Sequence, residues 1–474
     1  MLKIIELGRK NGPDIIYLTV LCLIVRVKIL LAGCLFGKMK TFKQIIPFLM
    51  VLLCLAAPST FWAQDANWPW VFDGENFAIT DSSQNSFSPS IASNDQIYFL
   101  VWHQKTGSIF NIYGARITKQ GNLLDPGGIP ICTVNSDQMY PSVAWDGVNF
   151  FVVWQDMRSG TEWDIYGARV DPEASAEEAV LDPSGIPIGV GKPSYDQMSP
   201  TLSFDGDNYL VVWQGKKNSK IWNICLSVVS KNGELINQNP IPLSPFSKNQ
   251  VFPAVSFNGD SYFVVWQEGT SSQFWGIVGA IVFPIGEITD PEKIHIRDML
   301  QISDKIQISP AVGEKVQWDR WRPEVSWNGR THLITWISQR SKGQWSIESK
   351  RFDPIFWILD TVDLVLENDS TSNVFPAILW DDQEKEYLLF WEDDLAGSIY
   401  GASLQAQSQP FVVSDAVPIS APDANNPSMP GASRIEDEIL IIWEGIGPGG
   451  NWQVYGQLLK RQVETPPVTT LAVN

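Results

Sequence analysis

The sequence predicts an all-β protein, a seven-bladed β-propeller of four-stranded antiparallel blades, closed by an N-terminal strand that completes the last blade. Three observations predict this fold. A unit of roughly 52 residues recurs seven times, each copy holds four short strand-like segments, and a further strand-like segment precedes the first complete copy. Four-stranded units repeated at this period are typical of propeller blades.

The composition is that of a globular chain rich in turns and aromatic residues. Of 474 residues, 44% are apolar and 18% are charged, with 21 Trp, 35 Gly and 31 Pro, which excludes a disordered chain, a coiled coil and a collagen. Asp and Glu number 52 against 34 Lys and Arg, which gives a net charge of −18. We therefore expect no nucleic-acid partner, because such a surface repels phosphate groups.

The N-terminal segment has the features of an export signal. Residues 39–63 contain two lysines, an apolar run and a small residue at the end, which is the order of a secretory signal peptide. We interpret residues 1–38 as a mis-called N-terminal extension, residues 64–462 as the propeller and residues 463–474 as a C-terminal tail. The expected location is secreted, periplasmic or on the cell surface, with no membrane span in the mature chain.

A tryptophan marks the same position in every copy. It stands in a segment such as Val152-Val153-Trp154-Gln155 and recurs at intervals of 52, 59, 53, 70, 55 and 52 residues. Apolar residues on both faces of this strand indicate a sheet that is covered on both sides. We expect each ring to pack between neighbouring blades. The seven residues are Trp102, Trp154, Trp213, Trp266, Trp336, Trp391 and Trp443.

Each copy begins with a proline-led strand. A proline precedes the tryptophan by thirteen residues in six copies, and Pro376 precedes Trp391 by fifteen. Proline cannot donate to a sheet ladder and is tolerated at a sheet edge, so this strand is predicted to be the inner edge of the blade, lining the central channel. A two-residue turn such as Asp146-Gly147 follows it, and positive φ is expected at both positions.

The third and fourth strands complete the unit. The third repeats the pattern of residues 164–170, DIYGARV, and the fourth that of residues 129–132, IPIC. Residues 77–80 precede Pro89 at the spacing by which residues 129–132 precede Pro141, so a fourth strand arrives before the first full copy. It can complete the last blade, and a closed ring leaves no open sheet edges. We therefore favour a propeller over a linear solenoid.

The pattern PSVAWDG, VVWQD and DIYGARV resembles the repeats of secreted bacterial β-propeller proteins that are loosely grouped with WD40-like propellers. It covers residues 76–459. The resemblance implies the fold and no particular activity, because propellers host lectins, adhesins, scaffolds, sialidases, lyases and dehydrogenases.

Strand direction predicts which face of the ring binds a ligand. The crossings between blades and the turns after the second strands share one face, which usually carries the ligand in propellers. Asn or Asp stands four residues before the proline in six copies. These residues form Asx turns, or they form a polar ring in which Asp137, Asp196 and Asp319 could hold Ca²⁺. The candidate ligand-binding residues are Asn85, Asp137, Asp196, Asn249, Asp319 and Asn426.

Two further groups are expected on that face. Amides and carboxylates follow the core tryptophan, as in Gln155, Gln214 and Glu444. An aromatic residue begins the third strand in most copies, and its role is either packing along the strand or stacking on a sugar ring. These rings are Phe110, Trp163, Trp222, Trp275, Trp345 and Trp452.

The interval of 70 residues contains an insertion, from about residue 283 to residue 322. Long connections of this kind often carry function. The insertion ends with two large rings and two cations, of which Arg322 is one, in a connection that the fold does not require. A surface flap packed on its own tryptophan is the alternative. We therefore add Trp318, Arg320 and Trp321 to the candidate ligand-binding residues.

Together these features favour a monomeric, non-catalytic binding module that recognises glycan or protein ligands on the predicted face. Two alternatives stay open: a carbohydrate-active hydrolase or lyase that uses carboxylates at the channel mouth, and a structural repeat domain of a cell-surface assembly. Only three histidines are present, and no phosphate loop, nucleophile elbow or metal-ligand spacing is found. No cofactor is expected apart from Ca²⁺.

Overall fold

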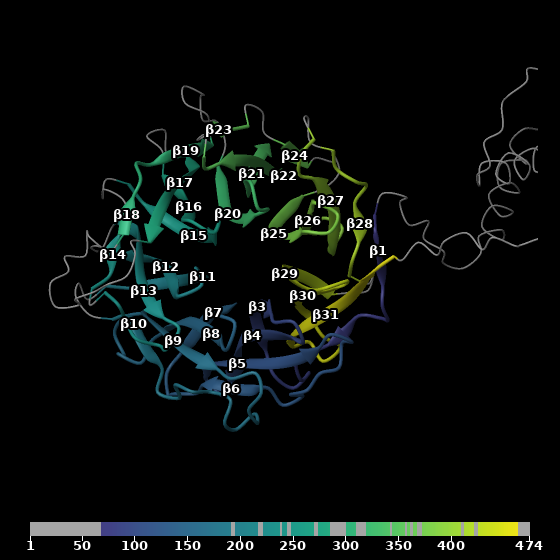
Figure 1. The fold of residues 1–474 in the computed structure, drawn as a ribbon. Helices are drawn as coiled ribbons and strands as arrows, with labels where there is room; N and C mark the ends of the chain where they lie inside the picture. The colour runs from purple at the N-terminus through teal and green to yellow at the C-terminus, as the bar shows by residue number, and fades with distance from the viewer. Residues whose placement is uncertain are drawn as a thin grey trace, which may run out of the picture. The chain divides into compact units, whose positions relative to one another are not determined.

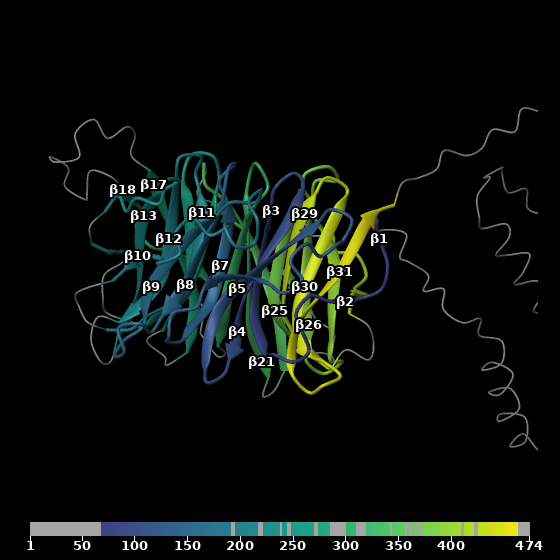
Figure 2. The same cartoon turned by 90° about the horizontal axis from the view of Figure 1, so that it is seen from below.

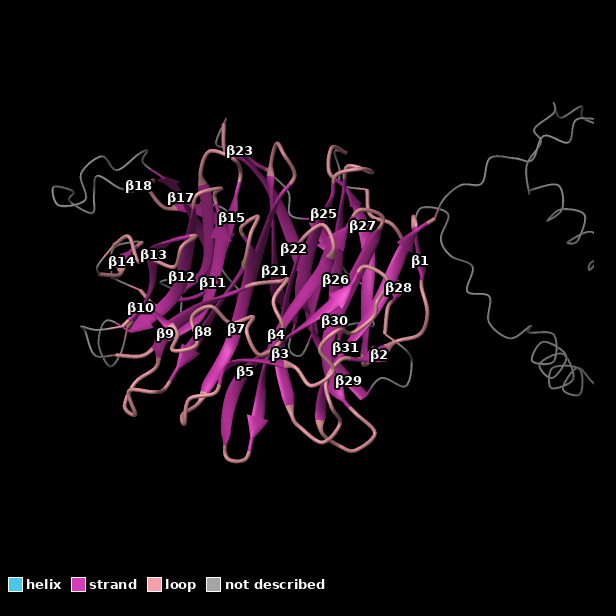
Figure 3. Ribbon diagram, turned by 60° about the horizontal axis from the view of Figure 1, so that its bottom comes forward, coloured by secondary structure: helices cyan, strands magenta, loops and turns pink. Residues whose placement is uncertain are grey.

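The computed structural model describes residues 68–462 apart from 191–194, 217–220, 238, 244–247, 270–273, 285–299, 310–318, 342–343, 356–357, 361–363, 367–371, 409–411 and 421–424. The described residues form strands and turns with no helix (Figure 3). Accordingly, they contain no helix that could span a membrane. The predicted N-terminal extension, signal peptide and C-terminal tail lie outside them, as does Trp318.

Seven antiparallel sheets stand around a central channel and close into a ring (Figure 1). This confirms the predicted seven-bladed β-propeller. The first strand of each blade lies innermost, and these strands contact one another around the whole ring. They are β3 (Ser86–Ser93), β7 (Gln138–Trp145), β11 (Gln197–Phe204), β15 (Gln250–Phe257), β20 (Arg320–Trp327), β25 (Asn373–Asp381) and β29 (Asn425–Ile435).

The remaining strands follow outward in chain order, and the side view shows the blades edge on (Figure 2). The second strands are β4 (Ile97–Thr106), β8 (Phe150–Asp156), β12 (Asn208–Lys216), β16 (Tyr262–Gly269), β21 (His332–Ser341), β26 (Glu386–Asp393) and β30 (Glu438–Ile446). The third strands are β5 (Ile109–Thr118), β9 (Asp164–Val170), β13 (Trp222–Ser230), β17 (Trp275–Pro284), β22 (Gln344–Asp353), β27 (Ser398–Gln405) and β31 (Trp452–Arg461). The outer strands are β6 (Ile129–Cys132), β10 (Ile186–Gly189), β14 (Ile241–Pro242), β18 (Leu300–Ile302), β19 (Ile306–Ser309), β23 (Ile358–Leu359), β24 (Leu364–Leu366) and β28 (Val417–Pro418).

The N-terminal strands complete the last blade, as predicted. Both β1 (Trp70–Phe72) and β2 (Phe77–Ala78) pair antiparallel with β31. In Figure 1 the purple β1 lies beside the yellow β31. The first and last parts of the propeller therefore share one sheet, and the ring has no open edge at this junction.

The repeated tryptophans pack between blades. Trp154, which is fully buried, packs with Phe99 and Val101 of the preceding blade. Trp213 packs in the same way with Phe151 and Val153. Full burial of an aromatic side chain contributes about 2–3 kcal/mol, so the repeated residue holds each pair of blades together through a dry contact.

The turns after the inner strands differ from the prediction in one respect. Gly147 has a φ of 92°, but Asp146 is not among the residues with positive φ. The Asp146 side chain instead accepts hydrogen bonds from the N–H groups of Val148 and Asn149, at 2.7 and 2.6 Å. The prediction of positive φ at both positions is therefore wrong, because the carboxylate organises the turn and only the glycine takes the left-handed conformation.

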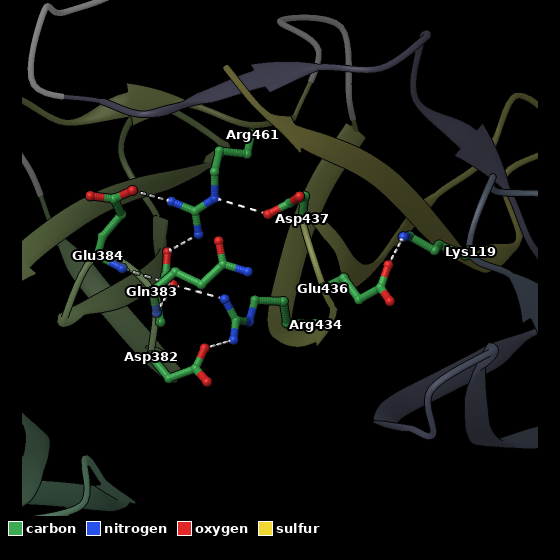
Figure 4. A network of polar contacts seen from close by, with 9 residues as sticks. Lys119, Asp382, Gln383, Glu384, Arg434, Glu436, Asp437 and Arg461 are labelled. Carbon is green, nitrogen blue, oxygen red and sulfur yellow. Dashed lines mark hydrogen bonds and ion pairs between the residues drawn. The ribbon is translucent and has the colours of Figure 1, made fainter. Parts of the chain in front are cut away.

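An ion-pair network joins the last two blades on the face of these turns (Figure 4). Asp381, fully buried at the end of β25, binds Arg434 at 2.8 Å and Arg461 at 2.7 Å. Arg434 also binds Asp382, and Arg461 binds Glu384 at 2.6 Å. The carboxylate of one blade is thus shared by two arginines of the next.

Candidate functional site

Every inner strand contains a bulge at its proline. In β7 the pairing passes from Met139 opposite Gln155 to Ser142 opposite Val153, so Tyr140 and its proline share one opposing residue. Tyr140 has a φ of 53°, in the left-handed region that few residues other than glycine adopt. Since proline has no N–H group, one of the two bulged residues brings no donor that needs a partner.

The residue before each proline adopts this conformation in all seven blades, with φ between 48° and 53°. We call these the bulge residues. Because the bulge recurs at one level of each inner strand, their positions form a ring around the channel. They are Ser88, Tyr140, Ser199, Phe252, Arg322, Phe375 and Met429.

In five blades the backbone N–H group of the bulge residue donates a hydrogen bond to a side chain of the preceding blade. Ser199 donates to Gln155 at 3.1 Å, and Phe252 donates to Gln214 at 2.9 Å. Both acceptors directly follow a core tryptophan, and both are buried. The remaining pairs are Ser88 with Glu444, Tyr140 with His103 and Arg322 with Gln267. The amides and carboxylates that the sequence analysis placed on the ligand face therefore bind backbone donors between blades.

The same position in the sixth blade predicts a pH-dependent stability. Ser428 donates to Glu392 at 2.6 Å, and burial, followed by the charges of Asp394 and Glu444, raises the pKa of Glu392 to about 7. A carboxyl whose pKa is raised in the folded state binds its proton more tightly there, which stabilises the folded state at low pH. This stabilisation is lost as the pH rises from about 4.5 through about 7. The urea midpoint of Glu392→Gln should therefore exceed that of the wild type by more at about pH 8 than at about pH 5.

The exposed Glu178 on an outer loop provides the control for this titration. The difference between Glu178→Gln and the wild type should be the same at both pH values. An equal, pH-independent difference for Glu392→Gln would contradict the prediction.

Five of the predicted Asn and Asp residues bind the preceding blade through backbone N–H groups. Asp137 accepts a hydrogen bond from Phe110 at 2.9 Å, and Asp319 accepts one from Trp275 at 3.0 Å. The other pairs are Asn85 with Trp452, Asp196 with Trp163 and Asn249 with Trp222. Each side chain thus ties a blade crossing to the start of a third strand.

Asn426 differs from this arrangement, and the predicted Ca²⁺ ligands do not form a common site. Asn426 is exposed, with a φ of 49°, in the strand that has two register shifts. Asp196 also binds Lys216 Nζ at 2.8 Å. No three His, Cys, Asp or Glu side chains in the described part of the chain form a group that could hold a metal ion. The structure therefore does not bring Asp137, Asp196 and Asp319 together as the Ca²⁺ prediction requires.

Arg320 and Trp321 lie in the inner strand β20, which corrects their placement in a loop. The proline at position 323 places the strand start here, as it does in the other copies. Arg320 is buried, with Nε 3.5 Å from Glu348. Trp321 is 39% exposed, and its ring lies 5.3 Å from that of Trp345. Only Trp321 of this pair therefore offers surface to a ligand.

Half-buried aromatic rings occur on the face of the blade crossings. All six rings predicted at the third-strand starts are partly exposed. The ring centre of Phe87 in β3 lies 6.1 Å from that of Phe110 and 5.8 Å from that of Trp452. Contacts with Phe87 therefore cover part of the Phe110 and Trp452 rings, and part of each ring stays accessible.

A cavity of about 450 Å³ lies between the inner strands. In β11 it is lined by residues 198–201, in the half of the strand nearest the blade crossing, so the cavity lies toward the predicted ligand face. Six of the seven bulge residues line it. Its other polar lining residues are Ser142, Thr201, Gln214 and Glu324.

Arg322 and Glu324 bring two charged groups into the cavity wall. The Arg322 guanidinium lies 4.9 Å from the ring of Phe252 and 4.8 Å from that of Phe375. Burial lowers its pKa, and the Tyr140, Glu324 and Glu444 side chains act in the opposite direction. Glu324 is open to the channel but surrounded by protein, and this enclosure raises its pKa to about 7 despite the attraction of Arg322.

No known family model and no curated protein matches this chain. Solved structures with a similar fold include the polysaccharide lyase Uly1, with a TM-score of 0.50 and 10% identity over 85% of this chain and 94% of that one. Puromycin hydrolase has a TM-score of 0.50 and 11% identity over 82% of this chain and 54% of that one. The β-propeller domain of the Trilobed protease from Pyrococcus furiosus has a TM-score of 0.45 and 11% identity, covering 81% and 99%. The likeness is one of fold alone.

Sequence reasoning missed most of the cavity. It pointed to Arg322 as one of the two cations at the end of the insertion but chose its neighbours Arg320 and Trp321, which do not line the cavity, and it left out Tyr140 and Phe252. A signal was present in the repeats: the residue before the proline varies among Ser, Tyr, Phe, Arg and Met, although the proline itself recurs in every copy. Variation at a position with an invariant backbone conformation indicates a side chain that does not serve the blade.

Proposed function

We propose that this chain is a carbohydrate-binding propeller whose ligand enters the central channel from the face of the blade crossings. One observation carries the proposal: the cavity wall combines aromatic rings with hydroxyl, amide and charged groups at the level of the bulge residues. Ligand pockets are typically about 300–1,000 Å³, with a few placed polar groups among apolar ones. The cavity of about 450 Å³ lies within that range.

The chemistry of the wall favours a saccharide. The rings of Tyr140 and Phe252 offer apolar faces, and the hydroxyls of Ser199 and Thr201 can bond to sugar hydroxyls. Uly1 is a polysaccharide lyase on a similar fold, so polysaccharides are the first ligands to test. Export and a monomeric state remain parts of this proposal.

Removal of an aromatic wall should weaken binding. A glycan array first identifies saccharides that bind the wild type. In calorimetry, we expect the affinity of Phe252→Ala for these saccharides to be about 10-fold weaker than that of the wild type, because an aromatic contact contributes about 0.5–1.5 kcal/mol beyond its buried area. The control is Phe72→Ala in β1, where the ring is 46% exposed and belongs to the last blade's outer edge. Equal affinities for the two variants would place the ligand outside the channel.

A second candidate function is carbohydrate cleavage, and Glu324 is the observation that favours it. A carboxyl with a pKa of about 7 in a cavity wall is suited to general acid–base catalysis near neutral pH. Incubation with the bound polysaccharide, followed by chromatography, shows whether shorter products form. If the chain cleaves the polysaccharide, Glu324→Gln should abolish product formation and retain binding. If the wild type leaves the polysaccharide intact, cleavage is excluded and binding is the function that stays.

A further inference from the structure

Arg322 differs from the other arginines of the propeller. Among the arginines whose side chains are described, seven pair with a carboxylate and Arg330 is exposed. The pairing is often bidentate, as in Arg169 with Asp182, where Nε and Nη2 both lie 2.9 Å from the carboxylate. Within the described residues, the guanidinium of Arg322 has two aromatic neighbours and no ion pair.

The surroundings hold Arg322 in place without satisfying its donors. Its backbone conformation is set by the bulge, and its backbone N–H group donates a hydrogen bond to the Gln267 side chain at 3.4 Å. The guanidinium carbon lies over the rings of Phe252 and Phe375, and a phenyl ring offers no oxygen that could accept a hydrogen bond from the guanidinium. An arginine has five N–H donors in a planar fork, and this fork belongs to the cavity wall.

The nearby carboxylates do not take the place of a partner. Glu444 accepts the N–H group of Ser88 at 2.6 Å, and Glu324 has a raised pKa of about 7. Neither lies within ion-pair distance of Arg322. The guanidinium of Arg322 thus lines the cavity without a carboxylate partner, and a ligand carboxylate or sulfate would bind it with two parallel hydrogen bonds.

The charge at this position is also specific to one blade. The six other bulge residues are Ser, Tyr, Phe or Met, and the whole chain has a net charge of −18. A single cation at the level of the cavity therefore does not reflect a basic surface. It gives the cavity one side on which an anionic group can bind.

We infer that Arg322 is the anion-recognition residue of the channel and that the ligand is an acidic saccharide, bearing a carboxylate or a sulfate. This inference rests on the proposed function, because it names the class of saccharide that the same cavity binds. The ring of Phe252, which lines the cavity, then provides an apolar wall for the sugar, and Arg322 selects for its charge.

The test compares matched ligands by calorimetry. Trigalacturonate and its uncharged methyl ester differ in charge and little in shape, and a sulfated disaccharide distinguishes sulfate from carboxylate. The wild type should bind at least one acidic ligand about 10- to 100-fold more tightly than the ester. Arg322→Met, which keeps an unbranched side chain between the rings, should lose that preference, and Arg322→Lys should retain only part of it.

The control variant is Arg330→Met, which removes an exposed arginine from the turn of the same blade. It should bind like the wild type. Equal binding of trigalacturonate and its ester, with no preference for the sulfated ligand, would overturn the inference while leaving carbohydrate binding intact. So would an unchanged preference in Arg322→Met.

If no saccharide binds, the proposed function fails, and inorganic sulfate then tests Arg322 alone. Sulfate should raise the Tm of the wild type relative to chloride at equal ionic strength by more than it raises that of Arg322→Met. Comparison of the two proteins removes the general stabilising effect of sulfate. Equal shifts would overturn the inference as well.

Discussion

Replacement of Asp381 by alanine should lower the free energy of unfolding by about 3–5 kcal/mol. Its side chain is fully buried and binds Arg434 and Arg461 at 2.8 and 2.7 Å. Removing the shared carboxylate leaves two guanidinium groups close together, with side chains only 14% and 11% exposed. Breaking a buried pair in this way is unfavourable because the two arginines lose their one buried partner and keep only the exposed Asp382 and Glu384.

The neighbouring Asp382 provides the matched control. It binds the same Arg434, but its side chain is 60% exposed. Exposed pairs contribute about 0–1 kcal/mol, so Asp382→Ala should change urea unfolding little. Tryptophan fluorescence reports both transitions. If Asp381→Ala were no less stable than Asp382→Ala, the network of Figure 4 would not hold the last two blades together.

The ring and its inner strands could be predicted because the repeat encodes them many times. A proline thirteen residues before the tryptophan in six copies, and fifteen before it in the other, indicates an edge strand in every blade. Residues 77–80 repeat the spacing of residues 129–132. A single such signal would be weak. Because the signals agree in seven copies, one strand order and a closed ring are the interpretation that fits all of them.

The site was less predictable because its residues act between blades. In the sequence Gln155 is one polar residue after a core tryptophan, and only the fold brings it to the N–H group of Ser199. Likewise, the sign of φ at Arg322 is not visible in a sequence that has no glycine there. Arg320 and Trp321 were placed in a loop because the insertion before them obscured the start of β20.

The closure of the ring predicts a second large effect, at Trp70. This side chain is fully buried and packs in one cluster with Trp443 and Leu459 of the last blade. The guanidinium of Arg461 lies 4.7 Å from its ring centre, so the same residue contacts both the ion-pair network and the N-terminal strand. Trp70→Ala should therefore reduce the free energy of unfolding by about 3–5 kcal/mol.

Phe72 in the same strand separates the loss of closure from the loss of an aromatic residue. Its ring is 46% exposed, so Phe72→Ala should change stability by no more than about 0.5 kcal/mol. Both variants keep the backbone pairing of β1 with β31, and urea unfolding measures the difference between them. A loss at Trp70 no greater than that at Phe72 would mean that the N-terminal strand lies on the last blade without stabilising the ring. In that case the contacts between the inner strands alone would close it.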